Sequence, residues 1–230
     1  MRHYNIAIDG PTGSGKSTLA KNLAARLGWA YLDTGAIYRT VGLYVYRAGA
    51  DPGDGAIVAA ALLPQMGISL RHEAGGQRVF LGEEDVSDEI RIPQVASYAS
   101  QVAVHPAVRA FLLDTQRAFA REHNVVMDGR DIGTEVLPNA DVKVFLTASL
   151  DARAQRRYKE LHERGVEINF EEVRENIRKR DERDMTRELS PLKAADDAVL
   201  LDTTHMDLEE SIEALVSLAE ERLTAIGDKA

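Results

Sequence analysis

Short apolar runs alternate with longer segments of helical periodicity along the chain. The first run, residues 5–8, is followed by a loop containing three glycines, and apolar side chains then recur every third or fourth position over 16–27. Gly28 is a natural helix stop. The pattern predicts a buried strand, a glycine-rich loop and a helix, in that order.

Four further apolar runs have the length of strands, and each is followed by Asp or Thr and then by helix-like sequence. They lie at 30–32, 125–127, 142–146 and 199–201. Strands separated by helices indicate a parallel sheet that is covered on both faces. We therefore expect an α/β fold built on a parallel sheet flanked by helices.

Two other regions depart from this alternation. Residues 66–90 contain two short apolar runs around Gly75-Gly76, which is typical of an antiparallel hairpin inserted outside the main sheet. Residues 151–188 are rich in arginine and glutamate and poor in apolar residues, so they are expected to be helical and largely exposed. A last helix is predicted over 207–223, with a core-facing stripe of Leu208, Ile212, Leu215, Val216 and Leu218.

Composition narrows the class of protein. The 230 residues are 44% apolar and 28% charged, which is ordinary for a globular chain with one substantial domain. Acidic residues outnumber basic ones by 37 to 28, for a net charge of −9, which disfavours nucleic-acid binding through bulk charge. The absence of cysteine excludes disulfides, thiolate metal sites and cysteine nucleophiles. With no signal pattern and no apolar run of ~18 residues, we expect a cytoplasmic protein with no membrane partner.

A loop that matches the phosphate-binding pattern G-x-x-x-x-G-K-[ST] in full follows the first strand. Its glycines allow backbone N–H groups to turn toward a phosphate, and the positive end of the next helix faces the same anion. Lys16 is expected to reach the β- and γ-phosphates, and the Ser17 hydroxyl to bind Mg²⁺. The preceding strand and the following helix disfavour a chance glycine-rich turn. ATP or GTP with Mg²⁺ is therefore expected at Gly10, Pro11, Thr12, Gly13, Ser14, Gly15, Lys16, Ser17 and Thr18.

The loop alone leaves the fate of the nucleotide open, because switches, motors, transporters and small-molecule kinases share it. The chain has no Asn-Lys-x-Asp segment of the kind that reads guanine, and a motor or transporter is usually larger. It has instead a second set of anion-binding candidates in residues 33–39, Arg109 and residues 129–131. This second set suggests that a phosphorylated molecule accepts the phosphoryl group.

The first segment of that set joins a strand to a helix. Asp33 ends the strand and Thr34 can cap the helix beginning near Gly35, which places Tyr38 and Arg39 on the first turns. Such a helix end can face a cleft. The alternative, a capped helix with an exposed arginine, stays open.

The other segment, residues 128–131, directly follows a predicted buried strand. Ligands of open parallel sheets bind beyond the carboxyl ends of the strands. Asp128 is therefore a candidate to hold Mg²⁺ through water, Arg130 to hold a phosphate, and Asp131 to accept from a base or sugar. A plain Asp-Gly turn is the alternative.

Arginines also gather on one predicted helical face in the charged region. Arg180, Arg183, Asp184 and Arg187 follow one another at i, i+3, i+4 and i+7. A solvated helix with surface ion pairs is the ordinary explanation. Beside a triphosphate site, the same face suggests a mobile cover that clamps the transferring phosphoryl group and excludes water. The preceding helix adds Arg153, Arg156 and Arg157 as further candidates.

Taken together, these motifs resemble the bacterial cytidylate kinase family, and the likeness runs from Asn5 to about Leu223. The combination of Asp-Thr-Gly-Ala-Ile-Tyr-Arg with Asp-Gly-Arg-Asp-Ile-Gly-Thr is especially specific. The segments that carry the resemblance are 10–18, 32–39, 99–103, 128–134 and 180–184.

The resemblance implies one kinase domain over 1–230 with a P-loop NTPase-like fold. Its core would be a five-stranded parallel sheet flanked by helices, formed by 1–33, 111–152 and 188–230. The region 34–110 would bind the nucleoside monophosphate and carry a small antiparallel sheet, and 153–187 would form a helical lid.

Carried over by position, the resemblance also implies an acceptor site for CMP or dCMP. Its members would be Thr34, Tyr38, Arg39, Ser100, Arg109, Arg130, Asp131, Arg180, Asp184 and Arg187. The phosphate would contact Arg39, Arg109 and Arg130, and the cytosine edge would contact Ser100, Arg109 and Asp131. Asp184 with Arg180 or Arg187 would contact the sugar.

The expected reaction is direct, in-line transfer of the γ-phosphoryl group of ATP to CMP or dCMP, a step of pyrimidine nucleotide metabolism. Lys16 and the lid residues Arg153, Arg157, Arg180 and Arg183 are expected to offset charge on the transferring group. The expected Mg²⁺ ligands are Ser17, Asp33 and Asp128, and the likeness favours a monomer. Two alternatives stay open: another acceptor such as UMP or dTMP, and a phosphate-loop protein without transferase activity.

Overall fold

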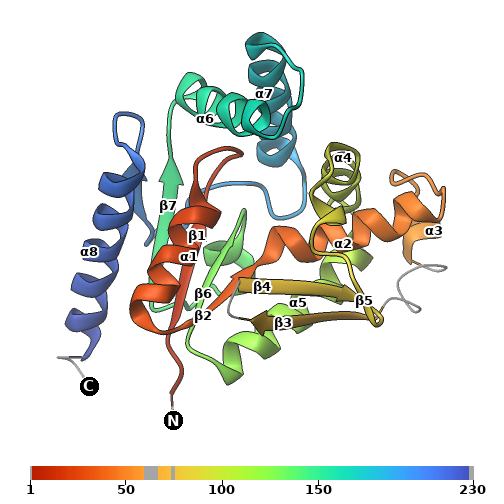
Figure 1. Ribbon diagram of the computed structural model, residues 1–230. Helices are drawn as coiled ribbons and strands as arrows, with labels where there is room; N and C mark the ends of the chain where they lie inside the picture. The colour runs from red at the N-terminus through yellow and green to blue at the C-terminus, as the bar shows by residue number, and fades with distance from the viewer. Residues whose placement is uncertain (1, 60–66, 74–75, 228–230) are drawn as a thin grey trace. The chain divides into compact units, whose positions relative to one another are not determined.

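The computed structural model describes residues 2–59, 67–73 and 76–227 (Figure 1). The chain divides into two compact units. The first unit comprises Met1–Trp29 and Asn124–Ala230, and the second comprises Ala30–His123. The predicted lid region lies in the first unit, and the predicted acceptor region lies in the second.

The main sheet has five strands in the order β2-β6-β1-β7-β8, and the pairs β1–β6, β1–β7 and β7–β8 are parallel. This confirms the predicted α/β architecture. The strands are β1 (Asn5–Asp9), β2 (Ala30–Asp33), β6 (Val125–Gly129), β7 (Val142–Thr147) and β8 (Val199–Asp202). The central strands β1 and β6 are buried, as their continuous apolar runs predict, whereas Leu200 on the edge strand β8 is 64% exposed.

Two helices of the first unit pack close to the sheet. Helix α1 (Lys16–Leu27) contacts β6 and β1, and α8 (Leu208–Gly227) contacts α1 and β7 (Figure 1). Helix α1 ends at Leu27 and is capped by Gly28, whose φ of 68° suits glycine, which confirms Gly28 as the predicted stop. The predicted stripe on α8 is wrong at its start: Leu208 is the first helical residue and is 57% exposed, while Leu215 is buried.

The charged region forms a pair of helices, α6 (Leu150–Glu163) and α7 (Phe170–Thr186), which lie against each other (Figure 1). They share a small apolar core of Ala154, Leu161, Val173 and Ile177. The prediction of helices is confirmed. The prediction that the region is largely exposed is only partly correct, since Arg153, Asp181 and Asp184 are buried.

The helical face predicted to include Arg187 ends before that residue. Helix α7 ends at Thr186, and Arg187 has extended backbone angles. Pro191 follows soon after, and proline cannot continue a helix because it lacks an N–H and restricts the residue before it. Arg187 therefore does not share a helical face with Arg180, which corrects the prediction.

The second unit contains the predicted antiparallel hairpin. Strands β3 (Ile68–Glu73) and β4 (Gly76–Leu81) pair antiparallel, and the short β5 (Glu84–Asp85) extends the sheet. Residue 66, where the predicted region begins, and Gly75 of the predicted turn lie outside the described residues. Among the residues of this unit that the structure describes, helical segments are α2 (Thr34–Arg47), α3 (Gly55–Ile57), the 3-10 turn η3 (Glu89–Arg91), α4 (Pro93–Val102) and α5 (Pro106–Glu122).

Helices α2 and α4 form the framework of the second unit, and their backbones approach closely at Gly42. A Cβ at this position would lie 2.7 Å from the backbone N of Ala99, so only glycine fits without a shift. The hairpin packs on α2 through an apolar cluster that includes Leu43, Val79 and Ile90. Within the described residues, no helix has the length and apolar character needed to cross a membrane.

Candidate active site

The glycine-rich loop of the first unit connects β1 to α1, as predicted. Gly10 lies against the sheet, where a Cβ would meet the carbonyl oxygen of Leu146 at 2.1 Å. Gly13 and Gly15 have φ of 76° and 88°, a backbone conformation that other residues rarely adopt. The close packing at Gly10 and the left-handed backbone at the other two positions explain why the loop needs its glycines.

Lys16 is buried in the first turn of α1, and its Nζ donates to the carbonyl oxygen of Pro11 at 3.2 Å. Burial, and then the positive charge of Arg130, lower the pKa of Lys16 to about 7. An incoming phosphate would supply negative charge beside this amine and favour its protonated form. Lys16 is therefore suited to bind a phosphate anion.

The side chains of Ser17, in the first turn of α1, and Asp128, in β6, place two oxygen atoms close together next to the loop. The Ser17 hydroxyl donates to Asp128 Oδ2 at 2.8 Å, and Asp128 is buried at the end of β6. Two oxygen ligands fit Mg²⁺, which usually keeps several waters and binds substrate phosphates as well. The described residues contain no cluster of three or more His, Cys, Asp or Glu side chains that could hold a metal by themselves.

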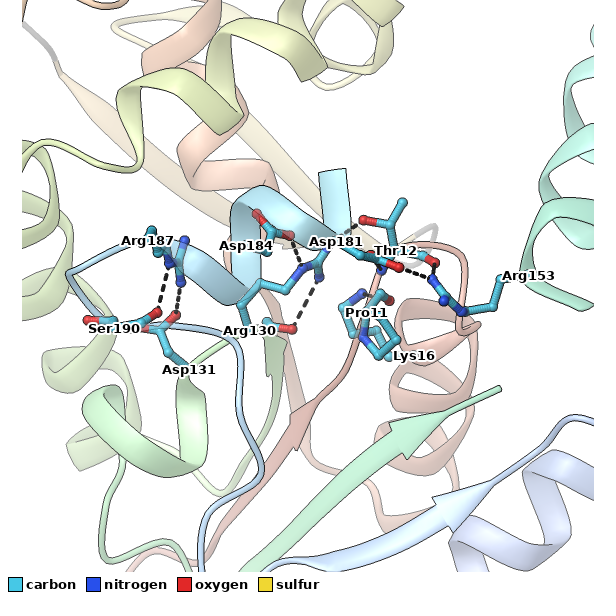
Figure 2. Close-up of polar contacts among 11 residues, drawn as sticks. Pro11, Thr12, Lys16, Arg130, Asp131, Arg153, Asp181, Asp184, Arg187 and Ser190 are labelled. Carbon is cyan, nitrogen blue, oxygen red and sulfur yellow. Dashed lines mark hydrogen bonds and ion pairs between the residues drawn. The ribbon is translucent and has the colours of Figure 1, made fainter. Parts of the chain in front are cut away.

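Arg130 connects the second anion-binding segment to the glycine-rich loop. Its Nε donates to Asp184 Oδ2 at 2.8 Å, and its Nη2 donates to the Thr12 hydroxyl at 3.0 Å (Figure 2). Burial would raise the pKa of Asp184, but Arg130 and Arg180 hold it below its usual value. A residue predicted to bind the acceptor phosphate is thus in direct contact with the loop.

Two more predicted acceptor residues meet beside this cluster. Arg187 forms an ion pair with Asp131, with Nη2 3.5 Å from Oδ1, and its Nε donates to the Ser190 carbonyl oxygen at 2.7 Å (Figure 2). Because Arg187 lies just past the end of α7, it reaches Asp131 from an extended segment. The structure therefore brings Arg130, Asp131, Asp184 and Arg187 into one cluster of alternating charge.

The second unit holds the other predicted acceptor residues around the start of α2. Asp33 caps the helix, with Oδ1 accepting from the N–H of Ala36 at 2.9 Å and Oδ2 accepting from Arg39 Nη2 at 2.8 Å. The expectation that Thr34 caps this helix is wrong by one residue, because Thr34 is already the first helical residue. Burial would raise the pKa of Asp33, but Arg39 and the Ala36 N–H hold it below its usual value.

Helices α4 and α5 contribute the remaining candidates of the second unit. Ser100 is buried on α4, and Arg109 on α5 lies with its guanidinium carbon 6.0 Å from the centroid of the Tyr38 ring. Arg109 Nη1 also donates to the carbonyl oxygen of Ala103 at 3.5 Å. Tyr38, on α2, thus has one of the predicted phosphate ligands beside its ring.

Comparison with known sequences shows the family of this chain. A protein-family model described as cytidylate kinase matches residues 6–221. The chain belongs to the cytidylate kinase family. It is 45% identical over 218 residues to a cytidylate kinase of Caldicellulosiruptor bescii, covering 95% of this chain and 96% of that protein. It is 48% identical over 220 residues to a cytidylate kinase of an Exiguobacterium species, covering 96% and 98%.

Solved structures are similar to this chain in fold but not closely in sequence. A gluconokinase from Sinorhizobium meliloti matches with a TM-score of 0.50 and 16% sequence identity, covering 99% of this chain and 98% of that one. At this identity the agreement concerns the fold alone, and the family assignment rests on the sequence relatives.

The arginines predicted to act on the transferring phosphoryl group have different surroundings. Arg153 is buried and bound to the phosphate loop, whereas Arg157 is half-buried and pairs with Glu160 at 2.6 Å. Arg180 is half-buried on α7, and Arg183 on the same helix is exposed. The direct roles of these four arginines in catalysis stay predictions.

Sequence reasoning misses two buried carboxylates of the first unit, Asp9 and Asp181. Asp9 accepts from the N–H groups of Ile132 and Gly133 at 2.8 and 2.7 Å, at the start of the π-helical turn η4 (Ile132–Val136). The available signal for Asp9 is a charged residue at the end of a buried strand. No local signal distinguishes Asp181 from the other acidic residues of its helix.

Asp9 should make the stability of the protein depend on pH. Burial raises its pKa to about 7, against the two hydrogen bonds from Gly133 and Ile132, which lower it. Because the unfolded chain releases this proton near pH 4, the contribution of Asp9 to the free energy of unfolding is fully present below about pH 4 and is lost as pH rises toward 7. Urea unfolding at pH 5 and pH 8 measures this change.

The matched variant is Asp9→Asn, which cannot titrate at this position. The free energy of unfolding of the wild type, minus that of Asp9→Asn, should fall by about 1–3 kcal/mol between pH 5 and pH 8. A difference that stays constant or grows over this range would show that Asp9 is already ionised at pH 5.

Proposed function

We propose that this chain transfers the γ-phosphoryl group of ATP to CMP or dCMP, giving CDP or dCDP and ADP. The observation that carries the proposal is the contact of Arg130 with both Thr12 of the phosphate loop and Asp184, in a chain that matches the cytidylate kinase family over residues 6–221. Phosphoryl transfer requires donor and acceptor phosphates to lie close together and in line. A phosphate bound by Arg130 would lie next to the loop that binds ATP.

The donor side of the reaction uses the phosphate loop. Its backbone N–H groups would bind the phosphates of ATP, and Lys16 would offset negative charge on the transferring group. Ser17 and Asp128 would hold Mg²⁺, which neutralises charge on the β- and γ-phosphates when bound. Asp33 stays a predicted metal ligand, although both of its oxygens already accept hydrogen bonds.

On the acceptor side, arginines would bind the phosphate of CMP and polar side chains would bind the cytosine and the sugar. We assign the phosphate to Arg39, Arg109 and Arg130, and the cytosine edge to Ser100, Arg109 and Asp131. The sugar is assigned to Asp184 with Arg180 or Arg187. The support is the likeness of the segments 32–39, 99–103, 128–134 and 180–184 to the motifs of the family, together with the ion pairs that join Arg130 to Asp184 and Arg187 to Asp131.

A panel of acceptors tests the assignment. The enzyme is mixed with ATP, Mg²⁺ and CMP, dCMP, UMP or dTMP in turn, and ADP formation is measured. Catalytic efficiency should be highest with CMP and dCMP, and ADP formation without an acceptor should be slow because water is excluded from the closed site. Faster turnover of UMP or dTMP than of either cytidine nucleotide would overturn the proposed substrate.

A cytoplasmic location, a monomeric state and a place in pyrimidine nucleotide metabolism complete the proposal. The net charge of −9 supports the absence of a nucleic-acid partner. Each of these properties stays a prediction.

A further inference from the structure

Thr12 of the phosphate loop is held at both of its backbone polar groups by the helix pair α6–α7. Its N–H donates to Asp181 Oδ1 at 3.1 Å, and its carbonyl oxygen accepts from Arg153 Nη1 at 2.9 Å (Figure 2). Arg153 Nη1 also pairs with Asp181 Oδ2. The two side chains and the Thr12 backbone therefore form a closed ring of hydrogen bonds.

This ring is buried and supported by further contacts. Arg153 and Asp181 are each only 8% exposed, and Arg153 Nε donates to the Ala148 carbonyl oxygen at 2.9 Å just before α6 begins. Gly13 lies against the same arginine, where a Cβ would meet the Arg153 carbonyl oxygen at 3.1 Å. The start of α6 and the phosphate loop are thus packed directly on one another.

The orientation of Thr12 determines which backbone groups of the loop are available to an anion. In a trans peptide the C=O and the following N–H point in opposite directions, so holding the Thr12 carbonyl toward Arg153 directs the Gly13 N–H away from it. The Thr12 N–H is itself occupied by Asp181. Arg156 binds a second carbonyl of the loop in the same way as Arg153, since its Nη1 donates to the Ser14 carbonyl oxygen at 3.3 Å.

The charge of the ring also fits a position beside a triphosphate. An unpaired Asp181 carboxylate near the loop would repel phosphate, and Arg153 neutralises it at close range. The contacts described for the Arg153 guanidinium group go to the loop, to Ala148 and to Asp181.

We propose that Asp181 and Arg153 act as a pair of positioning residues that fix the Thr12 peptide of the phosphate loop for ATP binding. Arg153 then acts through the loop backbone and does not contact the transferring phosphoryl group. This inference rests on the proposed function only in taking ATP as the nucleotide bound by the loop, and it is independent of which acceptor is used.

The test compares Asp181→Asn and Arg153→Gln with the wild-type enzyme. The Kd for a non-hydrolysable ATP analogue is measured by calorimetry, and KM for ATP, KM for CMP and kcat are measured by ADP formation. Both variants should raise the Kd and the KM for ATP about tenfold, with KM for CMP changed less than about threefold. The Kd of the double variant for the analogue should exceed that of either single variant by no more than about threefold, because each single substitution already breaks the same ring.

Asp151→Asn is the matched control. Asp151 pairs with Arg174 at 2.6 Å, so this ion pair joins the same two helices but is exposed and does not touch the loop. Its Kd for the analogue should equal that of the wild type. If Asp181→Asn does not fold, Arg153→Lys is the second test, because lysine keeps the charge but cannot reproduce the several directed bonds of the guanidinium group.

Two results would overturn the inference. An unchanged analogue Kd in Asp181→Asn, or in Arg153→Lys where only that variant folds, would show that the ring does not prepare the loop for nucleotide. A large loss of kcat in Arg153→Gln with normal ATP affinity would show instead that Arg153 acts directly on the transferring group. Because the calorimetric measurement needs no acceptor, a failure of the cytidine assignment leaves this test unaffected.

Discussion

Replacing Lys16 with methionine should lower kcat for phosphoryl transfer by about 10³-fold, the range observed when a single charged stabiliser of a transferring phosphoryl group is removed. Lys16 is buried, and its Nζ donates to the Pro11 carbonyl oxygen of the phosphate loop. Methionine fills similar volume and removes the ammonium group. Steady-state ADP formation at saturating ATP and CMP measures the effect.

Lys21→Met is the control for this substitution, since Lys21 is an exposed residue of the same helix α1. Its kcat should match that of the wild type within about twofold, and both variants should keep the wild-type melting temperature within a few degrees. Retention of more than about a tenth of wild-type kcat by Lys16→Met would remove Lys16 from the reacting centre.

Replacing Arg130 with alanine should raise KM for CMP about 100-fold and leave KM for ATP within about threefold of the wild-type value. A guanidinium group bound to a phosphate contributes two directed, charge-assisted hydrogen bonds, and alanine contributes none. The same change removes the arginine that pairs with the buried Asp184 carboxylate at 2.8 Å, so a loss of stability of about 3 kcal/mol is also expected. Kinetics at several CMP concentrations and chemical unfolding separate these two effects.

Arg178→Ala provides the comparison on the surface of α7. Arg178 pairs with Glu175 and Glu182 in an exposed network, and its removal should change neither KM by more than about twofold. Equal CMP kinetics in Arg130→Ala and the wild type would exclude Arg130 from the acceptor site.

The strands, the phosphate loop and helix α1 could be predicted because their causes are local. A short apolar run, a set of glycines and a helical period of apolar side chains each act within a few residues of sequence. Gly28 ends α1 for the same local reason, through its left-handed backbone. These features depend on no contact with a distant part of the chain.

Errors of one or two residues occur where two local solutions compete. Asp33 and Thr34 can both cap a helix, and the structure uses Asp33. Arg187 continues the helical spacing of arginines along α7, but the helix ends one residue earlier, at Thr186. A helical period alone does not show where the period ends.

The roles of Asp9 and Arg153 could not be predicted because their partners are distant in sequence. Asp9 binds backbone groups at 132 and 133, and Arg153 binds the backbone of Thr12. An arginine on a charged helix has the same sequence signal whether it faces solvent, a phosphate or a loop carbonyl. Only the tertiary structure distinguishes these three environments.

Direct movement of a phosphoryl group from ATP to a cytidine monophosphate can be followed with an isotope label. The enzyme is incubated with Mg²⁺, CMP and ATP labelled in the γ-phosphate, and the label is traced. Label should appear in CDP in step with ADP formation, with little label in inorganic phosphate. Label released mainly as inorganic phosphate, at the same rate with and without CMP, would rule out direct transfer to the cytidine nucleotide.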